Sequence, residues 1–319
     1  MEPYLTTLPT LPDIQAAAQR IKPFIHRTPV MTCAGLNEVT GASLFFKCEN
    51  LQKVGAFKFR GACNAVFSLS TQESQNGVAT HSSGNHAAAL ALAAKLRGIK
   101  AYIVMPKNSA EVKKKAVHTY GGEIVYCANN LAAREKTLNE IIAKRGADII
   151  HPYNDYRVIT GQATASLEML EDITNLDIII TPVSGGGLIS GTALTVHYLS
   201  PKTKVIAAEP AGADDAFRSL QSGTLQSSDH PQTICDGLRA ALGTLTFPIV
   251  QKYVSQIITV TDELTIKAMR LIWERMKIIV EPSAAITLGA LFADKIDARG
   301  KRVGIILSGG NVDLDALPW

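Results

Sequence analysis

Ile178-Ile179-Ile180-Thr181 is an apolar, β-branched run, and Ser184-Gly185-Gly186-Gly187-Leu188 follows it after two residues. A short run of this kind predicts a strand that is buried on both faces. Glycines after such a strand let backbone N–H groups converge, and a helix that begins near Leu188 would add its positive N-terminal end. The stretch therefore indicates a phosphate site, with close packing of strand against helix as the alternative explanation. It matches neither the Walker pattern nor the dinucleotide fingerprint.

Strand-like runs and helical periods alternate along the rest of the 319-residue chain. Stretches of helical period rich in Ala, Leu and Glu, such as 87–96 and 265–275, separate the runs. This alternation predicts an α/β fold with largely parallel, buried strands. We expect residues 78–152 to form a small domain, inserted in a large domain made of 1–77 and 153–319. The other expected strands are 44–47, 101–104, 123–126, 205–208 and 303–307.

Composition and charge disfavour several classes of protein. The net charge is only +4, and the single cationic cluster, Lys113-Lys114-Lys115, is better explained as a solvated helix face than as a nucleic-acid patch. The N-terminus has no secretory pattern, and no apolar run approaches the ~20 residues of a membrane span. The five cysteines lack CxxC spacing, which favours reduced thiols. We therefore expect a cytoplasmic protein that binds neither nucleic acid nor membrane.

Three further motifs follow expected strands or begin expected helices, where α/β folds bind their ligands. Lys58 lies between two aromatic residues, so desolvation can lower the pKa of its amine and make it an imine former and a base. A surface lysine is the alternative. Ser82-Ser83-Gly84-Asn85-His86 can cap a helix or hold a substrate carboxylate at the helix N-terminus. Ser308-Gly309-Gly310-Asn311 can end a strand in a turn or present a hydroxyl to a ring nitrogen.

Acidic residues follow another expected strand. Glu209 ends the strand, and Ala213-Asp214-Asp215 comes shortly after it. Two carboxylates with intervening backbone carbonyls suit Mg²⁺, Mn²⁺ or Ca²⁺. Acidic residues that stabilise a helix N-terminus are the alternative explanation. The pattern leaves both roles open.

Together and in this order, the motifs resemble those of the fold-type II pyridoxal phosphate enzymes, and among them the serine racemase and serine/threonine dehydratase family. The resemblance runs from His26-Arg27-Thr28-Pro29 to Ser308-Gly309-Gly310-Asn311-Val312-Asp313. It implies a fold like that of tryptophan synthase β, with two open, twisted, mostly parallel sheets flanked by helices. It also implies pyridoxal 5'-phosphate and a divalent cation as cofactors, a homodimer, and a nucleotide effector. Because the sequence ends nine residues after Gly310, we expect no C-terminal regulatory domain.

By position, the resemblance implies a role for each candidate residue. Lys58 resembles the lysine that holds the cofactor covalently and removes the substrate Cα proton. Ser83 resembles the acid/base on the opposite face of the ring. Cofactor contacts are implied for Phe57 beside the ring, Asn85 at the 3'-oxygen, Gly185, Gly186, Gly187 and Leu188 at the phosphate, and Ser308 at the pyridine nitrogen. Substrate contacts are implied for Ser82, Ser83, Asn85 and His86, and cation contacts for Glu209, Ala213 (through its carbonyl) and Asp215.

Three residues depart from the racemase pattern. Ser184 stands where racemases carry the first of four glycines, and Ala240 stands where a racemase has a serine on the substrate side. Tyr153 replaces an asparagine, and an aromatic residue at this position is common among dehydratases. The departures leave the elimination machinery intact and favour an ammonia-lyase over a dedicated racemase.

The expected activity is β-elimination from hydroxy amino acids such as L-serine, L-threonine or 3-hydroxyaspartate, which gives a 2-oxo acid and ammonia. The alternative is a serine racemase that interconverts L- and D-serine, with elimination as a side reaction. The 82–86 loop and the Glu209/Asp215 pair speak against a β-replacement enzyme of the cysteine synthase type. Intact Lys58 and Ser83 speak against an inactive sensor of an amino acid or nucleotide.

Overall fold

The chain forms two compact units, which we describe from a computed structural model that covers residues 6–109 and 111–319. The Lys58 unit consists of Met1–Ile25 and Lys58–Gly161, and the glycine-loop unit consists of His26–Phe57 and Gln162–Trp319. The chain therefore passes between the units three times, and one of these crossings is the Phe57–Lys58 peptide bond. The predicted domain boundaries at 77/78 and 152/153 lie elsewhere in the sequence and stay a prediction.

A six-stranded sheet forms the centre of the glycine-loop unit. Its strands are β1 (Val30–Met31), β2 (Ser43–Cys48), β7 (Ile178–Pro182), β8 (Lys204–Pro210), β9 (Gln256–Val260) and β10 (Arg302–Leu307). The strand order is β1-β2-β10-β7-β8-β9. Only β1 is antiparallel to its neighbour. β7 and β10 lie in the middle and are almost wholly buried, as parallel strands covered on both faces are.

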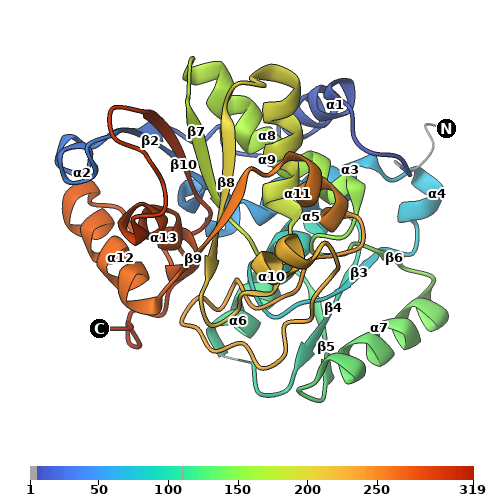
Figure 1. Cartoon of the computed structure of the whole chain (residues 1–319). Helices are drawn as coiled ribbons and strands as arrows, with labels where there is room; N and C mark the ends of the chain where they lie inside the picture. The colour runs from blue at the N-terminus through green and yellow to red at the C-terminus, as the bar shows by residue number, and fades with distance from the viewer. Residues whose placement is uncertain (1–5, 110) are drawn as a thin grey trace. The chain divides into compact units, whose positions relative to one another are not determined.

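Helices cover both sides of this sheet. They are α2 (Ala34–Thr40), α9 (Gly187–Leu199), α10 (Asp215–Ser222), α11 (Thr246–Tyr253), α12 (Asp262–Met276) and α13 (Pro282–Gly289), with short 3-10 turns η1 (Glu49–Leu51), η2 (Lys53–Gly55) and η3 (Ala290–Ala293). α13 packs against β7, β8 and β10, and α9 packs against β7 and β8. In Figure 1, α12 and α13 lie on one side of the strands, and α9 and α11 lie on the other. Burial of Phe46, Ile180 and Ile305 between these layers forms the core.

The Lys58 unit has a sheet of its own. Its four strands, β3 (Val78–His81), β4 (Ala101–Pro106), β5 (Glu123–Cys127) and β6 (Asp148–Ile149), are all parallel, in the order β5-β4-β3-β6. α5 packs on β3 and β4, and α7 packs on β3, β4 and β5. The helices are α1 (Leu11–Ile21), α3 (Lys58–Ser68), α4 (Thr71–Ser74), α5 (Asn85–Arg97), α6 (Glu111–Thr119) and α7 (Leu131–Arg145); α8 (Tyr156–Asp172) begins here and ends in the glycine-loop unit. The predicted α/β fold with two mostly parallel sheets is confirmed.

Strand register brings the motifs to one edge of each sheet. In the glycine-loop unit Ile305 pairs with Ile180, so Ser308 follows its strand level with Val183, directly before the glycine run. In the Lys58 unit Ala79 pairs with Ile149, so the 82–86 loop and residues 150–154 leave their sheet at the same edge. Carboxyl edges of parallel sheets are the usual place for ligands.

Two properties bear on the class of protein. Within residues 6–109 and 111–319, no helix has both the length and the apolar character required to cross a membrane. All five cysteines are free thiols, and four of them are buried.

Candidate active site

The Lys58 side chain projects from the first residue of α3. Its Nζ donates a hydrogen bond to the carbonyl oxygen of Pro152 at 2.9 Å. Burial of the amine lowers the pKa of Lys58 from 10.5 to about 8. A substantial fraction of the amine is therefore neutral near pH 8, and the neutral form is the one that attacks a carbonyl or removes a proton.

The 82–86 loop connects β3 to α5 and ends at a helix start without a side-chain cap. The N-cap residue is Gly84, and no side chain accepts a hydrogen bond in the capping position. The Ser82 hydroxyl instead accepts a long bond from the Gly84 N–H at 3.4 Å. The capping role considered for the serine and asparagine side chains is therefore absent here. The positive end of α5 suits a carboxylate.

His86 lies in the interior rather than on the surface of this loop. Its Nε2 donates to the carbonyl oxygen of Ile150 at 3.1 Å, and its Nδ1 is buried without a hydrogen-bond partner. Burial lowers the pKa of His86 to about 3, so the ring is neutral. The His86 ring thus ties the start of α5 to the residue after β6.

A turn of residues 151–154 supplies the carbonyl that contacts Lys58. Of these residues, the sequence marks only Tyr153 as a candidate. The His151 Nδ1 accepts hydrogen bonds from the backbone N–H groups of Tyr153 (3.3 Å) and Asn154 (2.9 Å). The His151 ring also makes edge contacts with the rings of Tyr153 and His81, at centroid distances of 4.6 Å and 6.0 Å. A histidine and proline directly after a strand are the only local signal for this turn.

In the glycine-loop unit, the run after β7 has the shape that a phosphate needs. Gly186 is the N-cap of α9 and has a φ of 93°, in the left-handed region. A Cβ on Gly186 would lie 2.7 Å from both the Leu242 Cδ2 and the Thr246 Cβ, so no larger residue fits. The Thr246 hydroxyl donates to the Gly185 carbonyl at 2.8 Å and accepts from the Gly243 N–H at 2.8 Å. Thr246 therefore holds the glycine loop in place. The sequence does not predict this role, because Thr246 lies 61 residues from Gly185.

Ser184 and Ala240, two of the residues that depart from the racemase pattern, are bonded to each other. The Ser184 hydroxyl donates to the Ala240 carbonyl at 3.1 Å and accepts from the Ala240 N–H at 3.0 Å. A glycine at position 184 could not make these two hydrogen bonds. The Ser184 side chain thus joins the glycine run to a segment 56 residues away in sequence.

The loop after β10 holds the segment that leads to Lys58. The Phe57 N–H donates to the Ser308 carbonyl at 3.0 Å, and the Gly310 N–H donates to the Gly55 carbonyl at 2.9 Å. The Asn311 side chain donates to the Val54 carbonyl at 2.7 Å. Val54 has a φ of 57°, which is rare for a β-branched residue and marks strain that its surroundings maintain.

The Ser308 hydroxyl lies in a buried position at the same edge. It donates to the Ser283 carbonyl at 3.3 Å. A bond of this length is weak, so the hydroxyl can rotate and donate to another acceptor. Ser283 is 25 residues away in sequence, and no sequence pattern predicts its contact with Ser308.

Glu209 and Asp215 are brought together at the start of α10. The two Glu209 oxygens accept from the N–H groups of Ala216 (2.7 Å) and Phe217 (2.8 Å), so the helix-stabilising role left open by the sequence is present. Both side chains are buried, at 1% and 2% exposure, and the Asp215 Oδ2 has no hydrogen-bond partner. Burial raises the pKa of Glu209 to about 8 and that of Asp215 to about 6. Among the described residues, no three His, Cys, Asp or Glu side chains gather as metal ligands.

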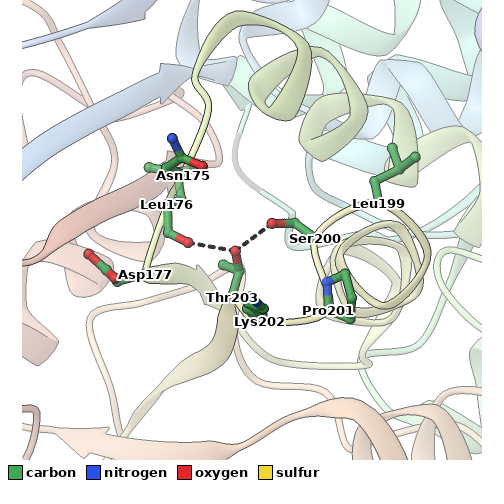
Figure 2. A pocket seen from close by; sticks show the side chains of 8 residues that line it. All are labelled: Asn175, Leu176, Asp177, Leu199, Ser200, Pro201, Lys202 and Thr203. Carbon is green, nitrogen blue, oxygen red and sulfur yellow. Dashed lines mark hydrogen bonds between the residues drawn. The ribbon is translucent and has the colours of Figure 1, made fainter.

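A pocket of about 380 Å³ lies at the opposite, amino-terminal edge of β7 and β8 (Figure 2). The Thr203 hydroxyl in its wall donates to the Leu176 carbonyl at 2.6 Å and shares a bond of 2.8 Å with the Ser200 hydroxyl. These polar atoms are satisfied within the wall, and none of the predicted site residues lines the pocket. In each unit the carboxyl edge of the sheet remains the place where the predicted site residues gather.

The two units therefore each assemble part of the predicted constellation. The Lys58 unit places Lys58 and the 82–86 loop around residues 150–154. The glycine-loop unit places Phe57, the Gly185–Leu188 run and Ser308 along one edge. A buried amine of lowered pKa is suited to bind an aldehyde, and a loop without side chains at a helix N-terminus is suited to bind a phosphate. Pyridoxal phosphate carries both an aldehyde and a phosphate.

Comparison with known proteins agrees with this chemistry. Residues 21–309 match the model of the family described as "Pyridoxal-phosphate dependent enzyme". The chain is 51% identical to a beta-hydroxyaspartate dehydratase of Paracoccus denitrificans (strain Pd 1222), over 98% of this chain and 99% of the relative. It is 51% identical to a serine racemase of Dictyostelium discoideum, over 99% and 98% of the two chains. The solved structure of maize serine racemase aligns with a TM-score of 0.95 at 46% identity, over 97% and 95%. On sequence, fold and site chemistry alike, the chain belongs to the pyridoxal-phosphate dependent enzymes.

Proposed function

We propose that the protein is an ammonia-lyase that eliminates the β-hydroxyl group of L-serine, L-threonine or 3-hydroxyaspartate to give a 2-oxo acid and ammonia. The observation that carries the proposal is the Lys58 amine, buried and with a pKa of about 8, in a chain of this family. The similarity to a beta-hydroxyaspartate dehydratase over 98% of the chain supports the substrate class.

Each part of the site has a task in this reaction. When bound, pyridoxal phosphate withdraws electrons and so stabilises negative charge at the substrate Cα. Lys58 holds the cofactor and, once released by the substrate amine, removes the Cα proton as general base. The uncapped start of α5 binds the substrate carboxylate, and the start of α9 binds the phosphate. The neutral Ser308 hydroxyl would donate to the pyridine nitrogen of the bound cofactor.

The remaining contacts follow the resemblance residue by residue. We assign the cofactor ring to Phe57, Asn85 and Ser308, and its phosphate to the backbone of Gly185, Gly186, Gly187 and Leu188. We assign the substrate to Ser82, Ser83, Asn85 and His86. Because the His86 ring is bonded to the Ile150 carbonyl, we assign its substrate contact to the backbone N–H.

Racemisation of serine is the second candidate function. Ser83 lies in the loop directly before α5, two residues from the expected ring contact Asn85, where a hydroxyl can give a proton to the second face of Cα. The similarity to the serine racemase of Dictyostelium discoideum supports this reading. Tyr153 and Ala240, which replace residues of the racemase pattern, are the reason to rank elimination first.

Incubation of the purified protein with L-serine, followed for pyruvate and D-serine together, tests the proposed function. We expect pyruvate and ammonia in equal amounts, with D-serine as a minor product. Excess D-serine would identify a racemase. No 2-oxo acid from any of the three hydroxy amino acids and no D-serine from L-serine, in protein that carries its cofactor, would contradict both candidate functions.

We further propose a divalent cation, Mg²⁺, Mn²⁺ or Ca²⁺, bound by Glu209, Asp215 and the carbonyl of Ala213. The support is the burial of both carboxyl groups and the unpartnered Asp215 Oδ2, because a bound cation would stabilise the charged forms that burial disfavours. The contacts of Glu209 with α10 are compatible with this, since each carboxylate oxygen has a second lone pair.

Chelation should lower the melting temperature of the protein, and Mg²⁺, Mn²⁺ or Ca²⁺ should restore it. A cation at a hundredfold excess over its dissociation constant stabilises the folded state by about 2.7 kcal/mol, which corresponds to roughly 4 °C for a chain of this length. Asp215→Asn should weaken the response. Asp214→Asn, which alters the adjacent and more exposed carboxylate, is the matched control and should keep it. An unchanged melting temperature in protein shown to be free of metal would rule out the site.

Assembly as a homodimer, response to a nucleotide effector and location in the cytoplasm stay predictions of the family resemblance. Sedimentation of the purified protein and assays with added ATP measure the first two directly.

A further inference from the structure

The His151 ring accepts hydrogen bonds in a way that fixes both its tautomer and its turn. Two backbone N–H groups, of Tyr153 and Asn154, point at Nδ1. Nδ1 therefore carries no proton, and a neutral ring has its proton on Nε2. Burial lowers the pKa of His151 to about 4, which keeps the ring neutral at physiological pH. The arrangement is that of an Asx-turn, in which a side-chain acceptor binds the N–H two residues later.

The carbonyl enclosed by this turn is the one that contacts the lysine. Pro152 lies between His151 and Tyr153, and its carbonyl oxygen accepts from the Lys58 Nζ at 2.9 Å. The proline has no N–H and a fixed φ, so the two N–H groups held by His151 belong to the next two residues. The direction of the Pro152 carbonyl thus depends on the His151 acceptor.

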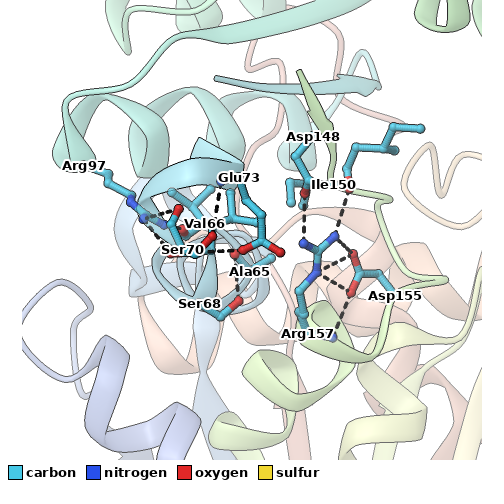
Figure 3. A network of polar contacts seen from close by, with 12 residues as sticks. Ala65, Val66, Ser68, Ser70, Glu73, Arg97, Asp148, Ile150, Asp155 and Arg157 are labelled. Carbon is cyan, nitrogen blue, oxygen red and sulfur yellow. Dashed lines mark hydrogen bonds and ion pairs between the residues drawn. The ribbon is translucent and has the colours of Figure 1, made fainter. Parts of the chain in front are cut away.

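Hydrogen bonds and ion pairs hold the residues before and after the turn in place. The His151 ring therefore affects mainly the middle of the turn. Before the turn, the Ile150 carbonyl accepts from His86. After it, the buried Arg157 guanidinium pairs with Asp155 at 2.7 Å and Asp148 at 2.9 Å, and donates to the Ile149 carbonyl at 2.9 Å. Figure 3 shows both carboxylates turned toward the Arg157 guanidinium.

We propose that His151 is a positioning residue, which acts through the Pro152 carbonyl to orient the free amine of Lys58. This inference rests on the proposed role of Lys58 as the general base. The carbonyl takes one N–H of the amine and so restricts the directions in which its lone pair or its proton can point. The arrangement would hold the amine in place after the substrate releases it.

Several charged or titratable groups lie near the amine or the turn. A charged Lys58 lowers the pKa of His86 and of His151, because it disfavours a second positive charge nearby. His81 and Asp155 act on His151 in opposite directions, and Glu135 and Arg134 act on His81. His86 and His151 stay neutral above about pH 5, since burial lowers the pKa of each to about 4 or below. Titration of the Lys58 amine can therefore be followed between pH 6 and 10 without a change in the charge of these two rings.

Three variants distinguish the effect of the hydrogen-bond acceptor at position 151 from the effect of the imidazole ring itself. His151→Asn keeps an acceptor at the same number of bonds from the backbone, because the amide oxygen takes the place of Nδ1. His151→Gln carries the same amide one methylene further out and cannot close the turn. His151→Ala removes the acceptor. Melting curves of each full-length variant establish that it is folded, and the Asn/Gln pair decides the question if the alanine variant is not.

The first readout needs no catalysis. In protein stripped of cofactor, the rate of acylation of Lys58 by an amine-reactive reagent is measured by peptide mass spectrometry from pH 6 to 10, relative to the exposed Lys202. An acceptor stabilises the ammonium form. We therefore expect the parent and His151→Asn to share one apparent pKa. In His151→Gln and His151→Ala that pKa should be lower by at least half a unit, a threefold change in the neutral fraction.

The second readout uses protein loaded with cofactor. We expect kcat to fall at least tenfold in the Gln and Ala variants and by less than threefold in the Asn variant, with KM nearly constant in all. Identical titration of Lys58 in every variant, or an Asn variant that behaves like Ala, would overturn the inference. Because the labelling does not depend on turnover, it tests the His151 turn even if Lys58 proves not to be the catalytic lysine.

Discussion

Lys58→Ala should abolish turnover, with a loss of at least about a thousandfold in kcat, because the covalent anchor of the cofactor and the general base disappear together. The variant should also lose the absorbance of protein-bound pyridoxal phosphate. Activity with L-serine and the absorption spectrum of the purified variant measure both effects.

Lys202→Ala is the matched control for this loss. Lys202 is exposed and lies in the loop between α9 and β8, so its removal should change neither the spectrum nor the rate. If Lys58→Ala were to retain more than a tenth of the parent activity, another residue would have to be the base.

Ser83→Ala should separate racemisation from elimination. The variant lacks the proposed proton donor on the face opposite Lys58, so formation of D-serine from L-serine and elimination from D-serine should fall at least about a hundredfold. Elimination from L-serine should fall less, by about tenfold or below, because Lys58 can still remove the proton. Chiral analysis of serine and a pyruvate assay with each enantiomer provide the comparison.

Ser68→Ala serves as the control for Ser83→Ala. Ser68 ends α3, and its hydroxyl donates only locally, to the Ala65 carbonyl, so both reactions should continue at the parent rate. Equal loss of all reactions in Ser83→Ala would make Ser83 a substrate-binding residue. No change in conversion of either enantiomer would contradict the two-base mechanism.

The parts of the fold that the sequence predicts are those with a local signal. The run Ile178–Thr181 and the strand that ends before Ser308 are apolar and β-branched, and parallel strands bring their carboxyl ends to one edge. The glycine run and the Ser308 loop therefore lie together as expected. β1 and β6 contain two residues each, too few to show a period. β3 and β9 are also absent from the expected strands, although β9 is an apolar, β-branched run.

The contacts that shape the site are harder to predict, because they join residues far apart in sequence. Thr246 holds the Gly185 carbonyl across 61 residues, and Ser184 holds Ala240 across 56 residues. Nothing near Thr246 marks it as part of the site. The sequence shows that Ser184 and Ala240 are both unusual, and the structure shows that the two departures form one contact.

Single-residue roles depend on burial, which the sequence shows poorly. The sequence places His86 in a polar loop, whereas the structure buries its ring against Ile150. Glu209 and Asp215 were open to two interpretations, and the structure shows that Glu209 does bind the start of α10. The pKa of Lys58 is lowered as expected from its aromatic neighbours, and burial is the cause.

The central claim is that Lys58 carries pyridoxal phosphate. The most direct test is to reduce the purified protein with borohydride, which makes the link between a lysine and the cofactor permanent, and to locate the modified lysine by peptide mass spectrometry. We expect the peptide containing Lys58 to carry the cofactor and the yellow absorbance to be lost on reduction. Attachment to any other lysine, or to none in protein that contains the cofactor, would show that Lys58 does not hold pyridoxal phosphate.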